Sequence, residues 1–198
     1  MTATTKRRPG GPRPNGPLLE REQIISEAAN LAREVGLANL SMRLLGDRLG
    51  VTSMAIYWYI SNRGELVAAI AEQVCGSIPE PDPDLPWDDW TRASSLQIHA
   101  TLAQYPGLTD YLMSAVEPPE ALRTRFLASV QKLVEAGLSE EDAGDSVTVL
   151  GTFVLARAQL DAHRTAAGMA PPTQIDPDRV LNSGIDHMID AVVHRLNR

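Results

Sequence analysis

Arginines and large aromatic side chains occur close together between residues 41 and 63 of this 198-residue chain. They are Arg43, Tyr57, Trp58, Tyr59 and Arg63. An arginine can hold a guanine through two parallel hydrogen bonds, a tyrosine hydroxyl can donate to a phosphate, and ring edges can touch thymine methyl groups. An exposed aromatic helix face can instead bind a protein partner. The side chains alone allow contact with DNA or with protein, so the elements that carry them decide between the two.

Two short amphipathic helices around a glycine turn are predicted in this segment. Ser41 can cap the first helix, and Gly50 then opens a tight turn. Thr52 can cap the second helix, in which Ile56 and Ile60 share the inward face at i, i+4 spacing. The large side chains mostly fall on its other faces. Two such helices joined by a short glycine-containing turn are typical of a helix-turn-helix.

The rest of the chain also shows a helical period. Apolar residues at helical spacing from Ile24 onward predict a helix that ends at Gly36. Asn62 and Glu65 have the spacing of a capping box, which predicts a further helix up to Gly76. After a proline-rich break at 79–86, helices are predicted at about 87–104, 107–115, 119–136, 139–166 and 177–196. No segment alternates with a strand period for long, so the predicted fold class is all-α.

Composition divides the chain into a basic arm at 1–19, a helix-turn-helix domain at 20–72 and an all-helical domain at 73–198. The arm is rich in proline and glycine and cannot bury enough apolar surface to become ordered, so we expect it to be flexible. Its basic residues are Lys6, Arg7, Arg8 and Arg13. They can enter a DNA minor groove, or they can form a solvated tail that gives only non-specific attraction.

The formal net charge of −7 is unevenly distributed. Residues 1–72 carry nine Lys and Arg against seven Asp and Glu, whereas residues 73–198 carry nine against eighteen. Such a split indicates two halves with different partners. The acidic excess favours a neutral or cationic ligand for the second half, although solvation of the surface explains the excess equally well.

Membrane and disulfide-stabilised classes are disfavoured. No apolar run approaches the roughly 20 residues of a membrane-spanning helix. The basic start of the chain lacks the apolar core of a signal peptide, so we expect no membrane partner and a cytoplasmic location. The single cysteine, Cys75, cannot form an internal disulfide and is most simply a small buried residue.

Catalytic and metal chemistry have no positive support in the sequence. No nucleophile motif or glycine-rich phosphate loop occurs, so we expect no enzyme and no cofactor. His187, Asp190 and His194 lie at i, i+3 and i+7 and could ligate a metal ion. The apolar stripe on the opposite face of their helix places them on the solvent side instead, so we expect no metal site.

The string LGVTSMAIYWYISNRGEL closely resembles the DNA-binding domain of the tetracycline-repressor (TetR) family of bacterial transcriptional regulators. The resemblance covers residues 20–72, and the strings HATLAQYPGL and LVEAGLSEEDA resemble the tetracycline-repressor type of C-terminal domain. It implies an N-terminal helix-turn-helix domain of three helices joined to a helical domain for ligand binding and dimerisation. The implied function is a repressor that an unidentified small-molecule effector releases from double-stranded operator DNA. The alternatives are an all-α protein-interaction module, or a small-molecule enzyme, with a coincidental helix-turn-helix.

The resemblance also implies roles for single side chains. Ser41 stands where the family places a helix-capping hydroxyl that touches phosphate, and Arg43 stands at a base-reading position. Arg43 can alternatively form a surface ion pair with Asp47, worth at most about 1 kcal/mol. Arg63 stands where the family usually has lysine and keeps a positive charge beside a helix N-terminus suited to phosphate.

The recognition helix implied by the resemblance contains two groups of contact residues. Its first turn, which points deepest into the groove and sets sequence preference, is formed by Thr52, Ser53 and Met54. The family's aromatic positions are Tyr57, Trp58 and Tyr59. Trp58 can alternatively cover the core of the small domain, because a buried tryptophan contributes a large apolar area.

The second half offers candidate effector-binding residues on several predicted helices. They are His99, Tyr111, Phe126, Phe153 and Arg157. These residues combine apolar faces with a few polar groups, which is the usual composition of a ligand pocket. Each can also be ordinary core. With the family resemblance they predict a site for a small, largely apolar molecule.

A homodimer is predicted through the helices near 140–165 and 177–196. Their apolar stripes consist of Val147, Leu150, Val154, Ala158, Leu181, Ile185, Met188, Ile189, Val192 and Leu196. Two such helices from each chain can bury these stripes in a four-helix interface.

Overall fold

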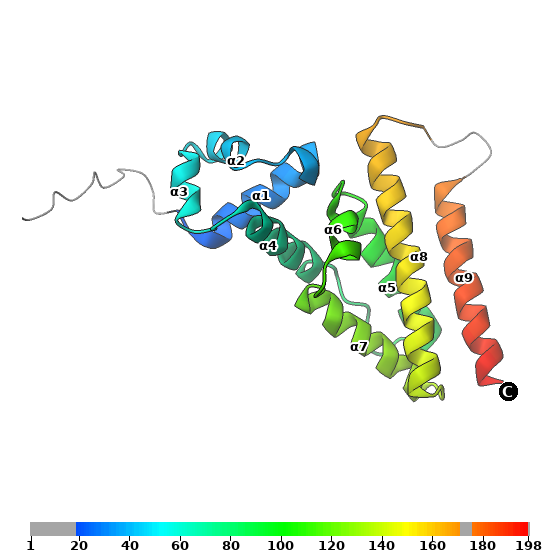
Figure 1. The fold of residues 1–198 in the computed structure, drawn as a ribbon. Coiled ribbons are helices and arrows are strands. Elements are labelled where there is room, and N and C mark those ends of the chain that lie inside the picture. The colour runs from blue at the N-terminus through cyan, green and yellow to red at the C-terminus, as the bar shows by residue number, and fades with distance from the viewer. Residues whose placement is uncertain (1–18, 171–175, 198) are drawn as a thin grey trace, which may run out of the picture.

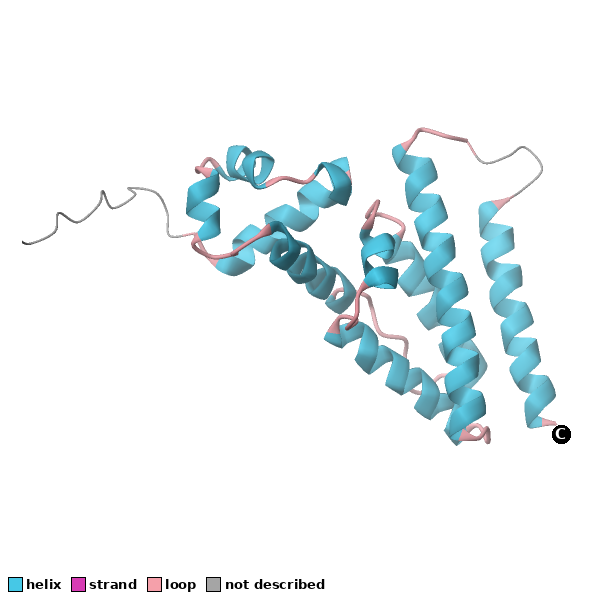
Figure 2. Ribbon diagram, in the orientation of Figure 1, coloured by secondary structure: helices cyan, strands magenta, loops and turns pink. Residues whose placement is uncertain are grey.

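The computed structural model describes residues 19–170 and 176–197, in which every regular element is helical (Figures 1 and 2). The elements are α1 (Arg21–Val35), the 3-10 turn η1 (Leu37–Asn39), α2 (Met42–Leu49), α3 (Ser53–Tyr57), α4 (Arg63–Gly76), α5 (Trp87–Leu102), α6 (Leu108–Ser114), α7 (Glu120–Glu135), α8 (Glu140–Ala166) and α9 (Pro177–Leu196). The predicted all-α fold class is confirmed. The basic arm predicted at 1–19 lies outside the described residues, apart from Leu19. No described helix is long and apolar enough to cross a membrane.

Helix α4 connects the two ends of the molecule. Helices α1 to α3 gather at one end, and α8 and α9 run antiparallel at the other (Figure 1). Along its length α4 packs on α1, on α5 and on α7. It runs without interruption across the boundary proposed between residues 72 and 73, and it ends at Gly76. The helix-turn-helix is therefore attached to the second half through a rigid element.

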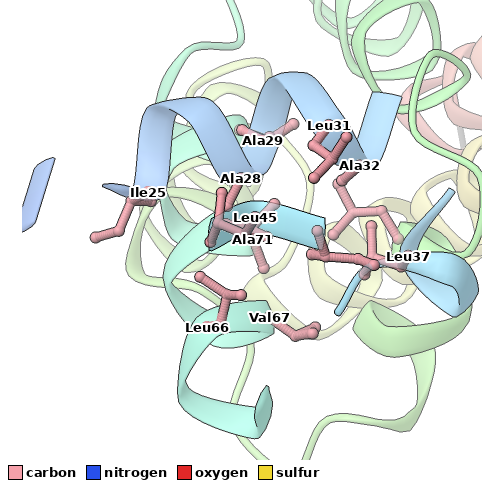
Figure 3. Packing of buried hydrophobic residues seen from close by; sticks show 14 of the residues in the cluster. Ile25, Ala28, Ala29, Leu31, Ala32, Leu37, Leu45, Leu66, Val67 and Ala71 are labelled. Atoms are coloured by element: carbon pink, nitrogen blue, oxygen red, sulfur yellow. The ribbon is translucent and has the colours of Figure 1, made fainter. Parts of the chain in front are cut away.

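The core of the N-terminal end is formed by α1, α2 and α4 (Figure 3). Ala28, Leu45 and Leu66, one from each of these helices, have no exposed surface. The same apolar cluster continues into the second half through Leu108 of α6 and Ala158 of α8. Because this cluster is close-packed, a shift of α6 or α8 also displaces the helices that carry the candidate DNA-contacting side chains.

A second core is enclosed by α5, α8 and α9. Val154 of α8 and Ile189 of α9 are buried in one cluster, against which Leu96 of α5 packs. The ring of Phe153 lies directly over Gly184 of α9, where an added Cβ would overlap it. The glycine thus lets α8 and α9 approach closely.

The apolar stripes predicted to form the dimer interface face this second core and its neighbours instead. Their buried members are Leu150, Val154, Ala158, Leu181, Ile185, Ile189 and Val192. Their predicted placement in an interface is wrong, because an apolar stripe shows that a face is covered without showing by what, and this chain's own helices cover it. The exposed large apolar residues of α8 and α9 are Val149, Leu160 and Val193.

Candidate nucleic-acid interface and cavity

The two helices α2 and α3 are capped and held close together. Ser41 Oγ accepts from the Leu44 N–H at 3.1 Å, and Thr52 Oγ1 accepts from the Ala55 N–H at 3.3 Å. Both caps agree with the sequence prediction. A Cβ on Gly46 would lie 2.8 Å from the Val51 carbonyl oxygen, so only glycine permits the approach of the turn to α2. These features fix the direction of α3 relative to α2.

The outer side of α3 and of the turn after it exposes large apolar side chains. Met54 is 68% exposed and Trp58 is 84% exposed, while Tyr57 and Tyr59 are also exposed. The alternative in which Trp58 covers the core of the small domain is therefore wrong. Ile56 fills that core and is fully buried. A group of large apolar side chains exposed to solvent on one face is typical of a binding surface.

Helix α3 is shorter than predicted. It ends at Tyr57, so Trp58 and Tyr59 belong to the turn that follows and not to the recognition helix itself. In that turn the Tyr59 N–H and the Ile60 N–H both donate to the Ile56 carbonyl, at 2.9 and 3.1 Å. Ile56 and Ile60 are both buried on the inward face, as predicted. Trp58 and Tyr57 are therefore exposed on the outer side.

The arginines of this domain differ in their partners. Arg43 is exposed, and within the described part of the chain it forms no ion pair with Asp47 or another carboxylate. Arg48 instead binds Glu27 and Glu34 of α1. The surface-ion-pair alternative for Arg43 is thus unsupported.

Arg63 binds the backbone around η1. Its Nη2 donates to the Leu37 carbonyl at 2.5 Å, and its Nε donates to the Leu40 carbonyl at 3.2 Å. The side chain therefore ties the start of α4 to the segment that precedes α2. The phosphate contact implied by the resemblance stays a prediction.

Glu65 fixes the start of α4. Its N–H donates to Asn62 Oδ1 at 2.9 Å, while its carboxylate accepts from the Ser61 N–H at 2.8 Å and from Arg21 at 3.2 Å. The hydrogen bond from Ser61, followed by that from Arg21, lowers the pKa of Glu65. The capping predicted from the Asn62 to Glu65 spacing is confirmed, with the return bond reaching Ser61.

The second half contains a cavity of about 290 Å³ among α5, α6, α7 and α8. Its wall is formed by Ile98, Leu112, Pro118, Leu122, Arg123, Arg125, Phe126, Ser129, Val147, Gly151 and Leu155. A smaller cavity of about 60 Å³ shares Ile98, Ser129, Val147 and Gly151 with it and extends toward α9. The larger volume lies just below the range of about 300–1,000 Å³ for ligand pockets.

Comparison with known proteins places the chain in a family. The family model "Bacterial regulatory proteins, tetR family" matches residues 24–70. An HTH-type transcriptional repressor of Mycobacterium tuberculosis is 36% identical over 173 residues, which cover 79% of this chain and 66% of that protein. The chain belongs to the TetR family. This TetR-family protein thus spans about two thirds of the length of that relative.

Solved structures share the fold of this TetR-family protein. A TetR variant of Acinetobacter baumannii AYE in complex with minocycline aligns with a TM-score of 0.75 at 21% identity, covering 89% of this chain and 97% of that chain. BioQ with its double-stranded DNA operator aligns with a TM-score of 0.73 at 20% identity, covering 88% and 98%. At these identities the likeness establishes the fold alone.

The five predicted effector residues of the TetR-family protein do not meet at one cavity. Phe126 lines the larger cavity, and Phe153 packs on Gly184. Tyr111 packs against the N-terminal core. His99 Nε2 lies 3.0 Å from Asp161, and Arg157 binds both oxygens of Asp161 at 2.7 Å. Only Phe126 of the five is placed by the structure at the cavity wall.

Arg125 and Ser94 were missed by sequence reasoning. Arg125 is 9% exposed, and its Nη1 donates to Ser94 Oγ at 3.2 Å. No local signal marked it, because arginine in a helix is as a rule exposed. Its partners come from α5 and from the segment just after α4, which only the tertiary fold brings together.

The His, Cys, Asp and Glu side chains are the candidate metal ligands in the sequence, and Cys75 is predicted to be buried. In the described residues, no group of three or more His, Cys, Asp and Glu side chains is placed to hold a metal ion. Cys75 is buried as predicted, and burial followed by the charge of Glu72 raises the pKa of its thiol to about 12.

Proposed function

We propose that the protein is a homodimeric, sequence-specific repressor whose α2 and α3 bind operator DNA and whose release is controlled by a small molecule in the cavity among α5, α6, α7 and α8. The observation that carries the proposal is the exposed face of Met54, Tyr57 and Trp58 on a capped helix-turn-helix. Membership of a family of bacterial regulators supports a regulator over an enzyme. Since operator DNA lies in the bacterial cytoplasm, the protein acts there.

The contacts to DNA are assigned to side chains on this face. Arg43 reads a base, while Ser41, Tyr57 and Arg63 contact phosphates. Thr52, Ser53 and Met54 enter the major groove at the start of α3, with Trp58 and Tyr59 flanking it. The exposure of these side chains and the family resemblance support these contacts. A protein-interaction module would use the same aromatic face without needing Arg43.

The outer sides of α8 and α9 are proposed as the dimer interface. Val149 and Val193 are exposed there, and a shallow groove between the two helices is lined by Asp145, Ser146, Thr148, Val149, Met188, Ala191 and Arg195. Two copies of this surface can meet around a two-fold axis.

Two contacts join the cavity wall to α4. Glu72 of α4 accepts from the Glu120 N–H at 2.9 Å and from the Ala121 N–H at 3.3 Å, which anchors the start of α7. Arg125, one turn further along α7, donates to the Ile78 and Pro79 carbonyls just after α4. A ligand that displaces α7 therefore moves α4 and the helix-turn-helix attached to it. To act, the ligand must bind the DNA-released state more tightly than the DNA-bound state.

Arg43→Ala tests the assignment to DNA. We expect the affinity for cognate DNA to fall by about 10-fold or more, because a bidentate arginine–guanine pair contributes about 1–3 kcal/mol of discrimination, while affinity for random DNA changes little. The matched control is Arg33→Ala, because Arg33 is exposed in the last turn of α1, outside α2 and α3. This end of α1 lies beside the second half, since the N–H of Leu37, just after α1, donates to the Pro106 carbonyl. Fluorescence anisotropy with labelled duplexes measures both. Equal losses on cognate and random DNA would show that Arg43 does not read a base.

A further inference from the structure

The cavity wall contains a buried arginine that has no carboxylate partner among the described residues. Arg125 is 9% exposed, and the acceptors of its hydrogen bonds are all uncharged. Its Nη2 donates to the Ile78 carbonyl at 3.0 Å and to the Pro79 carbonyl at 2.7 Å. A buried cation held only by neutral oxygens has lost hydration without gaining an ion pair, which is energetically costly.

The electrostatic surroundings of Arg125 leave this charge largely uncompensated. Burial lowers the pKa of Arg125, and the exposed Glu80 acts in the opposite direction from a distance. A guanidinium nevertheless stays protonated under all ordinary conditions. An anion that entered the cavity would therefore meet a full positive charge in a region of low dielectric, where charge-assisted hydrogen bonds are strong.

The walls of both cavities contain no Asp or Glu. The larger cavity has two arginines, Arg123 and Arg125, and is otherwise mainly apolar. Ser94 and Ser129 line the smaller cavity, and Ser94 accepts from Arg125. The acidic excess of residues 73–198 thus lies elsewhere on this half of the molecule. It does not determine the charge that the cavity prefers.

We propose that the effector is a small apolar monocarboxylate whose carboxylate binds Arg125 and whose apolar body lies against Leu122, Phe126 and Leu155. The proposal rests on the function proposed above, in which this cavity is the effector site. It reverses the neutral or cationic preference expected from overall charge. The cavity volume of about 290 Å³ fits a small acid.

The same arginine supplies a route from the ligand to α4. Because Nη2 is held by the Ile78 and Pro79 carbonyls, an incoming carboxylate competes with them for the same donors. A carboxylate is the stronger acceptor, since its hydrogen bond to arginine is charge-assisted. Binding therefore loosens the connection between α7 and the end of α4. The ligand changes the position of α4 by removing an existing contact.

Isothermal titration calorimetry with the full chain, without DNA, tests the proposal. The probes are benzoate, hexanoate and octanoate, each compared with its neutral amide and with the corresponding primary amine. We expect at least one acid to bind at least 10-fold more tightly than its amide, and the amine to bind more weakly than the amide. Amides that bind as tightly as every acid, or amines that bind more tightly, would overturn the proposal. So would the absence of measurable binding of all three acids at 10 mM.

Three variants locate the binding to Arg125. Arg125→Met should reduce the preference for acid over amide to less than 2-fold, whereas Lys132→Met, which removes a cation on the same helix outside both cavity walls, should keep it. Arg125→Met also leaves the Ile78 and Pro79 carbonyls without this hydrogen-bond donor and can impair folding. Glu80→Gln therefore provides an independent test of the charge preference. Removing that negative charge should tighten binding of the acid by about 2-fold or more and leave the amide unchanged. An unchanged acid affinity in Glu80→Gln together with an unchanged preference in folded Arg125→Met would refute the proposal. Binding of an acid without any effect on DNA affinity would instead contradict the proposed function.

Discussion

Replacing Val154 or Ile189 by glutamate should unfold the C-terminal half of the chain rather than separate a dimer. Both side chains are buried within one chain, at 1% and 7% exposure, between α5, α8 and α9. An uncompensated charge in such a core costs about 3–5 kcal/mol, a large part of the 5–15 kcal/mol that typically stabilises a protein. Circular dichroism should show loss of helix or a strongly lowered melting temperature.

The matched controls are Val149→Glu and Val193→Glu on the outer sides of α8 and α9. These positions are 51% and 40% exposed, so the same charge costs little in the isolated chain. Size-exclusion chromatography with light scattering should report a folded monomer for either variant. A folded monomer from Val154→Glu would contradict the interior placement, and a dimer that persists in both controls would contradict the proposed interface.

Gly46→Ala should abolish DNA binding while the second half stays folded. The new Cβ would lie 2.8 Å from the Val51 carbonyl oxygen and 3.2 Å from the Ser53 nitrogen, and neither backbone atom can move without moving α3. Overpacking of this kind costs about 1–3 kcal/mol, which exceeds the gain of up to about 1 kcal/mol in helix propensity. The larger effect is on DNA affinity, because α3 no longer presents its side chains at the right angle to the groove. We expect a loss of 100-fold or more.

Gly144→Ala is the matched control for Gly46→Ala. Gly144 also lies inside a helix, but an added Cβ there meets no atom within 4 Å. We expect unchanged DNA affinity and a melting temperature equal to or above that of the wild type. Thermal melts and anisotropy titrations on the two variants give the comparison. Retained DNA binding by Gly46→Ala would show that the close approach of α2 and the turn is not needed.

The helices could be predicted from the sequence because their signals are local. The helix predicted at 139–166 is observed at Glu140–Ala166, where Ser139 caps it, and the helix predicted to end at Gly76 does so. Apolar period and capping residues depend only on near neighbours. The η1 turn and the early end of α3 were missed, because one turn of helix leaves almost no periodic pattern.

The cavity and the covered faces could not be predicted in the same way. The period of α8 identified Val154 as buried, but the partner that buries it comes from α5 and α9, which are distant in sequence. Arg125 belongs to the cavity because the middle of α5 and the segment just after α4 converge on it. Side chains that act together across several helices are a property of packing, which a single-sequence pattern does not contain.

A footprint of the wild-type protein on the DNA upstream of its own gene tests sequence-specific DNA binding. Two-fold symmetry would place the two α3 helices about 34–36 Å apart, or at a wider multiple of the helical turn, on one side of the duplex. We expect a protected, near-palindromic segment that is bound at least 100-fold more tightly than a scrambled duplex of the same composition at equal salt. Equal affinity for the native and the scrambled duplex, or no protection at micromolar protein, would contradict a sequence-specific DNA-binding function.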